Sequence, residues 1–310
     1  MRTFRTGLGL LVIMGILAGP SLGADLGDKA APLKIAEWIK GGPVDMAKGK
    51  DKTIYVVEFW ATWCPPCRQA IPHLTELQKK YKDKGVVVIS VSDESPRVVK
   101  AFVDKQGSKM DFVVAADKNR ATSAAYMQAF RQGSIPHAFI VDKKGRIVWH
   151  GHPMAALDQI LGEVVEGTYD VEKARKIDQA SGLIPKYFEL VVEGTEKKKA
   201  DELGKQIIAD AGSSFELMDR FAWAILSAPQ IKYRDLGLAM TAAETGYKAC
   251  NGKNASMVDT YARALFQAGK IGEALKLQQQ ALELVRDPRL KAEMQQRLKE
   301  YEAKVVANPA

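Results

Sequence analysis

Cysteine is scarce in this chain. Only three occur among 310 residues, and two of them, Cys64 and Cys67, stand three positions apart. A secreted disulfide scaffold needs a denser set of cysteines, so that class is excluded. The close pair is therefore expected to serve chemistry. Cys250, alone in the C-terminal half, is expected to be a small buried hydrophobe, with an intermolecular disulfide as the alternative.

Long hydrophobic runs are also missing. The most apolar run, residues 7–18, is shorter than the ~20 residues that span a bilayer. It follows Arg2 and Arg5 and precedes small residues around Ser21 and Gly23, which is the pattern of a secretory signal peptide over residues 1–23. We therefore expect a periplasmic or otherwise exported protein, with an uncleaved membrane anchor as the alternative.

No stretch concentrates charge of one sign. The formal net charge is +8, but the basic residues are spread along the chain, so no nucleic-acid partner is expected. Histidine is rare as well, with four in the chain. His150 and His152 stand close together without a third ligand, so no metal site is expected, and His137 is expected at an ordinary polar strand position. We expect no cofactor.

The chain does contain an apolar, strand-like run at 54–60 that ends shortly before Cys64-Pro65-Pro66-Cys67. The amino end of the helix that follows favours an anion, so Cys64 is the expected thiolate, and its sulfur is expected to be exposed at the mouth of that helix. Neither proline carries an N–H or a positive charge, and the Cys67 N–H is the nearest remaining donor. We therefore expect a moderately lowered pKa of the Cys64 thiol and a reducing redox potential of the Cys64/Cys67 couple.

Glu58 is the unusual residue of that run, because a carboxylate inside a buried strand has a raised pKa and costs stability. Six residues before Cys64, it is expected to lie beneath the cysteines and to take the proton from Cys67. The alternative is a structural carboxylate paired with a lysine such as Lys52.

The run from Glu58 to Cys67, followed by Ile135-Pro136 and then by 139–142 with Gly145, closely resembles thioredoxin-fold proteins of the TlpA/ResA-like thiol-disulfide oxidoreductase type. The resemblance covers residues 26–155. It implies that Pro136 is cis and faces the cysteines, and that the Ile135 backbone binds the partner chain. Trp63 is expected at the border of this substrate site.

The resemblance implies a reductase of protein disulfides, in which Cys64 attacks the partner and Cys67 releases it. Its implied partners are a disulfide-containing protein substrate, with apocytochromes among the family's clients, and a membrane-embedded thiol electron donor. Two alternatives remain open: a disulfide oxidase or isomerase that uses the same residues, and a non-enzymatic periplasmic interaction protein with a structural disulfide. A thiol peroxidase is excluded, because residues 57–64 lack the pattern around its reactive cysteine.

We predict a thioredoxin-like α/β domain over 24–155, with a mixed sheet and helices on both faces. Its expected strands are 54–60, 86–91, 112–114, 138–141 and 146–150, with an edge strand near 31–39 and helices at 65–82, 95–106 and 121–130. The loop 91–96 leaves the carboxyl end of a strand, where loops commonly line sites. A helix cap by Ser95 explains that loop equally well.

Residues 156–310 are predicted to be all helical. The periodic segments are 156–165, 171–180, 184–192, 196–210, 214–227, 234–250, 255–268, 271–286 and 288–305. Small residues at Ala262, Gly269, Ala274 and Ala281 resemble the tetratricopeptide pattern, so a repeat-like domain that binds a protein partner is the hypothesis. A helical pack that merely completes the fold is the alternative.

Overall fold

The computed structural model describes residues 23–307. The predicted signal peptide, apart from its last residue, lies outside the described residues. The described chain divides into two compact units after Gly167. None of its helices is long and apolar enough to cross a membrane.

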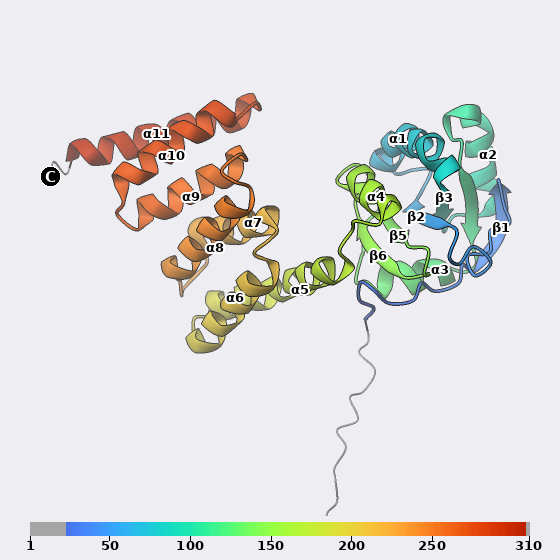
Figure 1. Cartoon of the computed structure of the whole chain (residues 1–310), viewed down its shortest axis with the longest axis horizontal. Coiled ribbons are helices and arrows are strands. Elements are labelled where there is room, and N and C mark those ends of the chain that lie inside the picture. The colour runs from blue at the N-terminus through green and yellow to red at the C-terminus, as the bar shows by residue number, and fades with distance from the viewer. Residues whose placement is uncertain (1–22, 308–310) are drawn as a thin grey trace, which may run out of the picture. The chain divides into compact units, whose positions relative to one another are not determined.

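The first unit is built on a six-stranded mixed sheet (Figure 1). The strands are β1 (Ile35–Lys40), β2 (Ile54–Trp60), β3 (Val86–Ser92), β4 (Val113–Asp117), β5 (His137–Val141) and β6 (Ile147–Gly151). Their order is β1-β4-β3-β2-β5-β6, in which β2, β3 and β4 are parallel and the other pairs are antiparallel. The predicted mixed sheet is confirmed, and β2 is buried along its whole length.

Helices cover both faces of this sheet. Right-handed crossovers place α1 (Pro65–Tyr81) and α2 (Pro96–Gln106) on one face, and the return from β4 to β5 places α3 (Ala121–Ser123) on the other. The chain continues from α3 into a π-helical stretch, η3 (Ala124–Gln128), in which Ala129 N–H donates to the Ala124 carbonyl. The prediction of a regular helix at 121–130 is therefore only partly correct. In this stretch, hydrogen bonds between residues i and i+5 replace the i to i+4 bonds of an α-helix.

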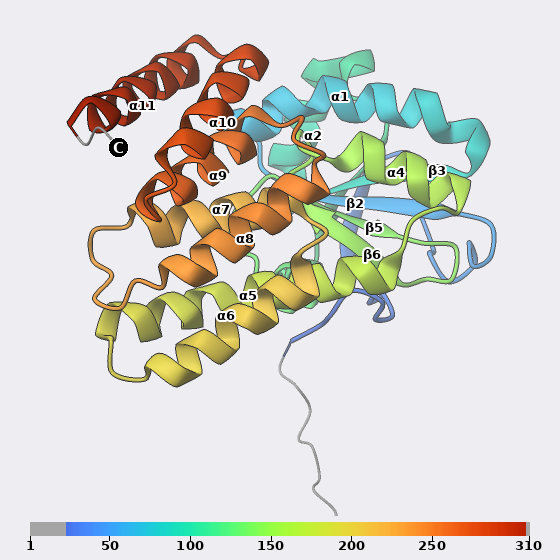
Figure 2. The same ribbon diagram turned by 60° about the vertical axis from the view of Figure 1, so that its left-hand side comes forward.

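α4 (Leu157–Glu166) belongs to the first unit. Its Leu157 and Leu161 are fully buried, and its Asp158 accepts hydrogen bonds from Lys80 and Tyr81 of α1. Figure 2 shows α1 and α4 on the same side of the strands. The domain boundary predicted at 155/156 lies before α4. The compact units divide after α4, because this helix packs against α1 of the first unit.

The second unit consists of helices that stack in chain order (Figures 1 and 2). They are α5 (Val171–Glu193), α6 (Lys197–Ala211), α7 (Phe215–Ser227), α8 (Leu236–Ala249), α9 (Ala255–Gln267), α10 (Ile271–Leu284) and α11 (Pro288–Ala307). The pairs α5/α6, α7/α8 and α9/α10 pack as hairpins, and α11 packs against α10. The small side chains of Ala262, Ala274 and Ala281 are fully buried. The tetratricopeptide relationship stays a prediction.

One helix replaces two predicted ones at the start of this unit. The sequence predicted separate helices at 171–180 and 184–192, but α5 continues through Pro185. Ala180 and Tyr187, on either side of the proline, are buried in the same hydrophobic core. Packing on both sides therefore outweighs the lost backbone hydrogen bond. Cys250 has a free thiol and is half-buried against this core, so the expectation of a small buried hydrophobe is met only in part.

Candidate functional site

Cys64 and Cys67 form a disulfide at the amino end of α1. Cys64 is the N-cap residue, Pro65 and Pro66 occupy the first turn, and the Cys67 N–H donates to Cys64 Sγ at 3.2 Å. This is the donor that the sequence predicted, since the two prolines have none to offer. The first turn of the helix contains no acidic residue, so no carboxylate there opposes a negative charge on Cys64.

The Ile135–Pro136 peptide bond is cis and lies beside the disulfide. Cys64 Sγ is 3.9 Å from the Ile135 carbonyl oxygen. Pro136 immediately precedes β5, which pairs with β2, so the sheet itself brings this segment to the cysteines. The structure therefore brings four of the predicted site residues together, Cys64, Cys67, Ile135 and Pro136, although Cys64 and Ile135 are 71 positions apart in the chain.

The cysteine side chains are less accessible than expected. Cys64 is 3% exposed and Cys67 is 1% exposed, so the prediction of an openly exposed Cys64 sulfur is wrong for this disulfide state. The Ile135 carbonyl oxygen and the Cys67 N–H lie against Cys64 Sγ. Cys64 remains the more accessible of the two sulfur-bearing residues.

The two tryptophans near the cysteines have opposite environments. Trp63 is 68% exposed, whereas Trp60 is buried and packs against Phe102 of α2 with ring centroids 5.4 Å apart. A cavity of about 300 Å³ opens next to Trp63 and Ile135. Asp93 and Arg120, which form an ion pair at 3.1 Å, also line it. Trp63 and Ile135 thus border a recess next to the disulfide.

Glu58 is buried in the middle of β2, and it faces the side of the sheet that α1 and α2 cover. This follows from strand alternation, because Trp60 lies on the same face and contacts Phe102 of α2. Burial raises the pKa of the Glu58 carboxyl to about 8, although a hydrogen bond from Ser90 acts in the opposite direction. Ser90 Oγ donates to Glu58 Oε2 at 2.5 Å.

The partner of Glu58 is therefore Ser90 on the neighbouring strand, whereas the lysine considered from the sequence, Lys52, is exposed at the protein surface. The second carboxyl oxygen, Oε1, is buried and has no hydrogen-bond partner among the described residues. A carboxyl group with a pKa near 8 and one unoccupied oxygen can both release and accept a proton close to neutral pH.

Glu94 is a residue that the sequence reasoning did not single out. Its carboxylate accepts from the Thr62 backbone N–H at 2.6 Å and from the Thr62 hydroxyl at 2.8 Å. Ser92 Oγ donates to the same carboxylate at 3.2 Å. The available signal was the position of loop 91–96 at the carboxyl end of a central strand. Ser95, the predicted cap, makes no side-chain capping bond to α2.

His137 and His150 form a pair on the other face of the sheet. His137 Nε2 and His150 Nδ1 are 3.0 Å apart, and His137 directly follows the cis-proline. Burial, and secondarily the charges of His150 and His152, lower the pKa of His137 to about 4. Within residues 23–307 no cluster of three or more histidine, cysteine or acidic side chains is suited to hold a metal ion.

Comparison with known proteins gives consistent matches for the first unit. Residues 26–150 match the model of the AhpC/TSA family. Thiol-disulfide oxidoreductase ResA of Bacillus anthracis is 35% identical over 136 residues, which cover 44% of this chain and 69% of that protein. Protein FixW of Rhizobium leguminosarum is 27% identical over 169 residues, which cover 52% of this chain and 75% of that protein.

Solved structures give matches over a similar share of the chain. A thiol:disulfide interchange protein of the thioredoxin family from Chlorobium tepidum TLS is 25% identical. The match covers 46% of this chain and 99% of that chain, with a TM-score of 0.37.

Proposed function

Because this chain belongs to the ResA-like family of thiol-disulfide oxidoreductases, we propose that it reduces disulfide bonds in exported client proteins. The observation that carries the proposal is the Cys64–Cys67 disulfide at the amino end of α1, with Cys64 Sγ against the carbonyl that precedes cis-Pro136. This arrangement combines an anion-favouring helix end with an adjacent backbone acceptor for a bound chain.

The reaction begins with the reduced pair. The Cys64 thiolate attacks one sulfur of a client disulfide, and the other client sulfur leaves as a thiolate that takes up a proton. Cys67 then loses its proton and attacks Cys64 Sγ, which releases the second client thiol. The protein is left with the Cys64–Cys67 disulfide, the state that the structure contains.

Glu58 is the proposed acceptor of the Cys67 proton. It lies in the face of the sheet that α1 covers, its pKa is about 8, and its Oε1 has no other partner among the described residues. A base with a pKa close to that of a free thiol transfers protons efficiently in both directions. Trp63 and the Ile135 backbone are the proposed contacts of the client chain.

The return to the reduced state requires two electrons and two protons from another dithiol. We propose a membrane-embedded thiol donor, because an exported protein has no access to cytoplasmic reductants. Export itself rests on the predicted signal peptide. Fractionation of cells that express the full chain tests it, and recovery of the protein in the cytoplasm with residues 1–23 intact would contradict it.

The central test is reduction of insulin disulfides by the dithiol form. Cys64→Ser is expected to abolish turnover, because the attacking thiolate is lost, whereas Cys250→Ser is the matched control and is expected to retain it. Unchanged turnover in Cys64→Ser would eliminate the proposed role of the pair and favour a structural disulfide.

The direction of electron flow is tested by the redox potential. Equilibration with glutathione is expected to place the Cys64/Cys67 couple nearer the about −270 mV of reductants than the about −120 mV of strong oxidants. The reason is that Pro65 and Pro66 add no positive charge that would stabilise the thiolate further. A potential at the oxidising end would reverse the assigned direction.

A further inference from the structure

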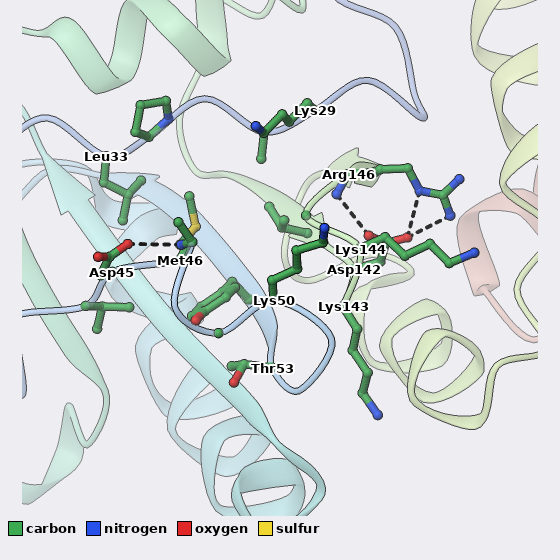
Figure 3. Close-up of a pocket in the computed structure, with 18 of the residues that line it drawn as sticks. Lys29, Leu33, Asp45, Met46, Lys50, Thr53, Asp142, Lys143, Lys144 and Arg146 are labelled. Carbon is green, nitrogen blue, oxygen red and sulfur yellow. Dashed lines mark hydrogen bonds and ion pairs between the residues drawn. The ribbon is translucent and has the colours of Figure 1, made fainter.

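A second cavity lies at the end of the sheet opposite to Cys64. It measures about 820 Å³, and Figure 3 shows most of the residues that line it. Tyr55 and Val141, which are paired across β2 and β5, line this cavity. They lie four residues along β2 from the paired Phe59 and His137 at the cis-proline end, or about 13 Å at about 3.3 Å per residue. The cavity is therefore distinct from the disulfide site.

Three segments that are distant in sequence form its walls: the strand-free stretch 27–33, the loop 44–53 between β1 and β2, and the turn 141–146 between β5 and β6. The apolar side chains larger than alanine among the lining residues are Pro32, Leu33, Val44, Met46, Tyr55 and Val141. A volume of this size falls within the range of ligand sites, and its apolar wall favours an apolar group of the occupant.

The rim of the cavity is basic. Lys29, Lys50, Lys143 and Lys144 line it, and none of the four has an ion-pair partner among residues 23–307. They come from all three wall segments. Four unbalanced ammonium groups around one opening create a positive potential that attracts anions.

The two acidic residues of the lining do not cancel this charge. Asp142 accepts from Arg146 Nε at 3.0 Å and from the terminal Nη2 at 2.8 Å, so these two residues neutralise each other. Asp45 lies 3.7 Å from Lys48, which is not part of the lining. Five basic and two acidic side chains line the cavity, so a formal excess of three positive charges remains.

The directions of these lysines decide what kind of anion fits. In Figure 3, the side chains of Lys143 and Lys144 leave the turn in different directions, and Lys50 points toward the 142–146 turn. A single phosphate or carboxylate cannot contact such diverging ammonium groups together. We propose that the cavity binds an extended acidic segment of a partner polypeptide, which inserts one apolar side chain between the walls and pairs its carboxylates with the rim lysines.

The test is fluorescence anisotropy of a labelled peptide, Asp-Glu-Glu-Leu-Glu-Glu-Asp, titrated with the oxidised protein. Saturable binding is expected. Replacing the leucine of the peptide by serine, or its acidic residues by amides, is expected to weaken binding by roughly tenfold or more, the equivalent of about 1.4 kcal/mol. Equal affinity of all three peptides would overturn the proposal.

Variants of the protein locate the binding. Lys50→Gln removes one rim charge, and Ala47→Trp fills the cavity from an exposed position without changing any charge. Each is expected to weaken binding by roughly tenfold. Lys105→Gln removes an exposed charge of α2 outside the cavity and is the matched control, with a change below about twofold.

Two outcomes would contradict this site. Equal losses of peptide affinity in Lys50→Gln and Lys105→Gln would mean that binding depends on the net charge of the protein and not on this cavity. Absence of peptide binding, together with binding to phosphatidylglycerol vesicles that Lys50→Gln weakens, would assign the surface to a membrane. Circular dichroism of each variant establishes that it is folded, and if Ala47→Trp does not fold, Lys50→Gln and the peptide series still decide the question.

Discussion

At the scale of single residues, burial sets the proton affinity of Glu58. A carboxyl group with a pKa of about 8 carries its proton at neutral pH, and the hydrogen bond from Ser90 only partly offsets the loss of water. Glu58 is thus mostly protonated at neutral pH, and only its ionised fraction, which grows as the pH rises toward 8, can serve in the proposed role of proton acceptor.

Glu58→Gln is expected to slow the release of a mixed disulfide between Cys64 and a client. The wild-type rate should rise with pH through about 8, because the carboxylate form increases over that range. The variant should lose this inflection and fall by about 10²-fold. Rapid-quench measurement with a labelled client resolves the step. An unaltered rate and pH profile would rule out the proposed proton transfer.

The same substitution changes the dependence of stability on pH. The folded-state pKa of about 8 exceeds the ordinary 4.5, so the contribution of Glu58 to stability is lost as pH rises from about 4.5 through 8. Each pKa unit between the two values corresponds to about 1.4 kcal/mol of unfolding free energy. In urea unfolding of the oxidised protein, Glu58→Gln should therefore lose less stability than the wild type as the pH rises through this range. Equal losses of stability in the two proteins would contradict a buried carboxyl group with a raised pKa.

For His137 the expected dependence of stability on pH has the opposite sign. Its pKa of about 4 in the folded state lies below the ordinary 6.5, so stability is lost as pH falls from about 6.5 to 4. His137→Asn should remove up to about 3 kcal/mol of this dependence. His150→Asn should retain most of it, because burial of His137 is the larger cause. Urea midpoints between pH 4 and 7 distinguish the two variants.

Part of the site follows from local sequence. The spacing of Cys64 and Cys67, the two prolines between them and the buried strand before them determine which backbone donor reaches Cys64. Ser90 and Glu94 could not be chosen from the sequence, because strand register and loop conformation place them. The degree of Cys64 exposure was mispredicted since it depends on the distant cis-proline segment.

At the scale of secondary structure elements, the Thr62–Glu94 contact connects the loop before α1 to the loop after β3. Glu94→Ala should lower the unfolding free energy by about 1.5–3 kcal/mol, the typical contribution of hydrogen bonds to a charged group. Glu94→Gln keeps one carbonyl acceptor and should lose less unfolding free energy than Glu94→Ala. Urea unfolding measures both, with the exposed Glu37→Ala as the matched control. Equal stability of all three variants would show that the contact contributes nothing.

The strands were predictable because their apolar runs are bounded by turn residues. The five strands predicted from residue 54 onward all overlap observed ones, and the boundaries differ by a few residues. The helices between and after them were less predictable. The π-helical stretch at 124–128 and the continuation of α5 through Pro185 both depend on packing against other elements, which local periodicity does not contain.

At the scale of the whole molecule, the division after Gly167 makes a prediction about truncation. A chain that ends at 167 keeps α4 and should fold with the stability of the first unit. A chain that ends at 155 loses the buried Leu157 and Leu161, and it should be less stable by roughly 3–6 kcal/mol. Thermal unfolding of the two fragments checks this difference.

Asp158→Ala in the longer fragment is the control for the polar part of the α1–α4 contact. It removes the acceptor of Lys80 and Tyr81 but leaves both leucines, so a smaller loss is expected. If the two fragments were equally stable, α4 would contribute nothing to the first unit.

The Glu94 carboxylate binds the backbone and the hydroxyl of Thr62, the residue directly before Trp63. The conformational entropy of this segment is thus lost while the chain folds, before any client arrives. For the proposed client, less of the binding free energy would then be spent on ordering the backbone at Thr62.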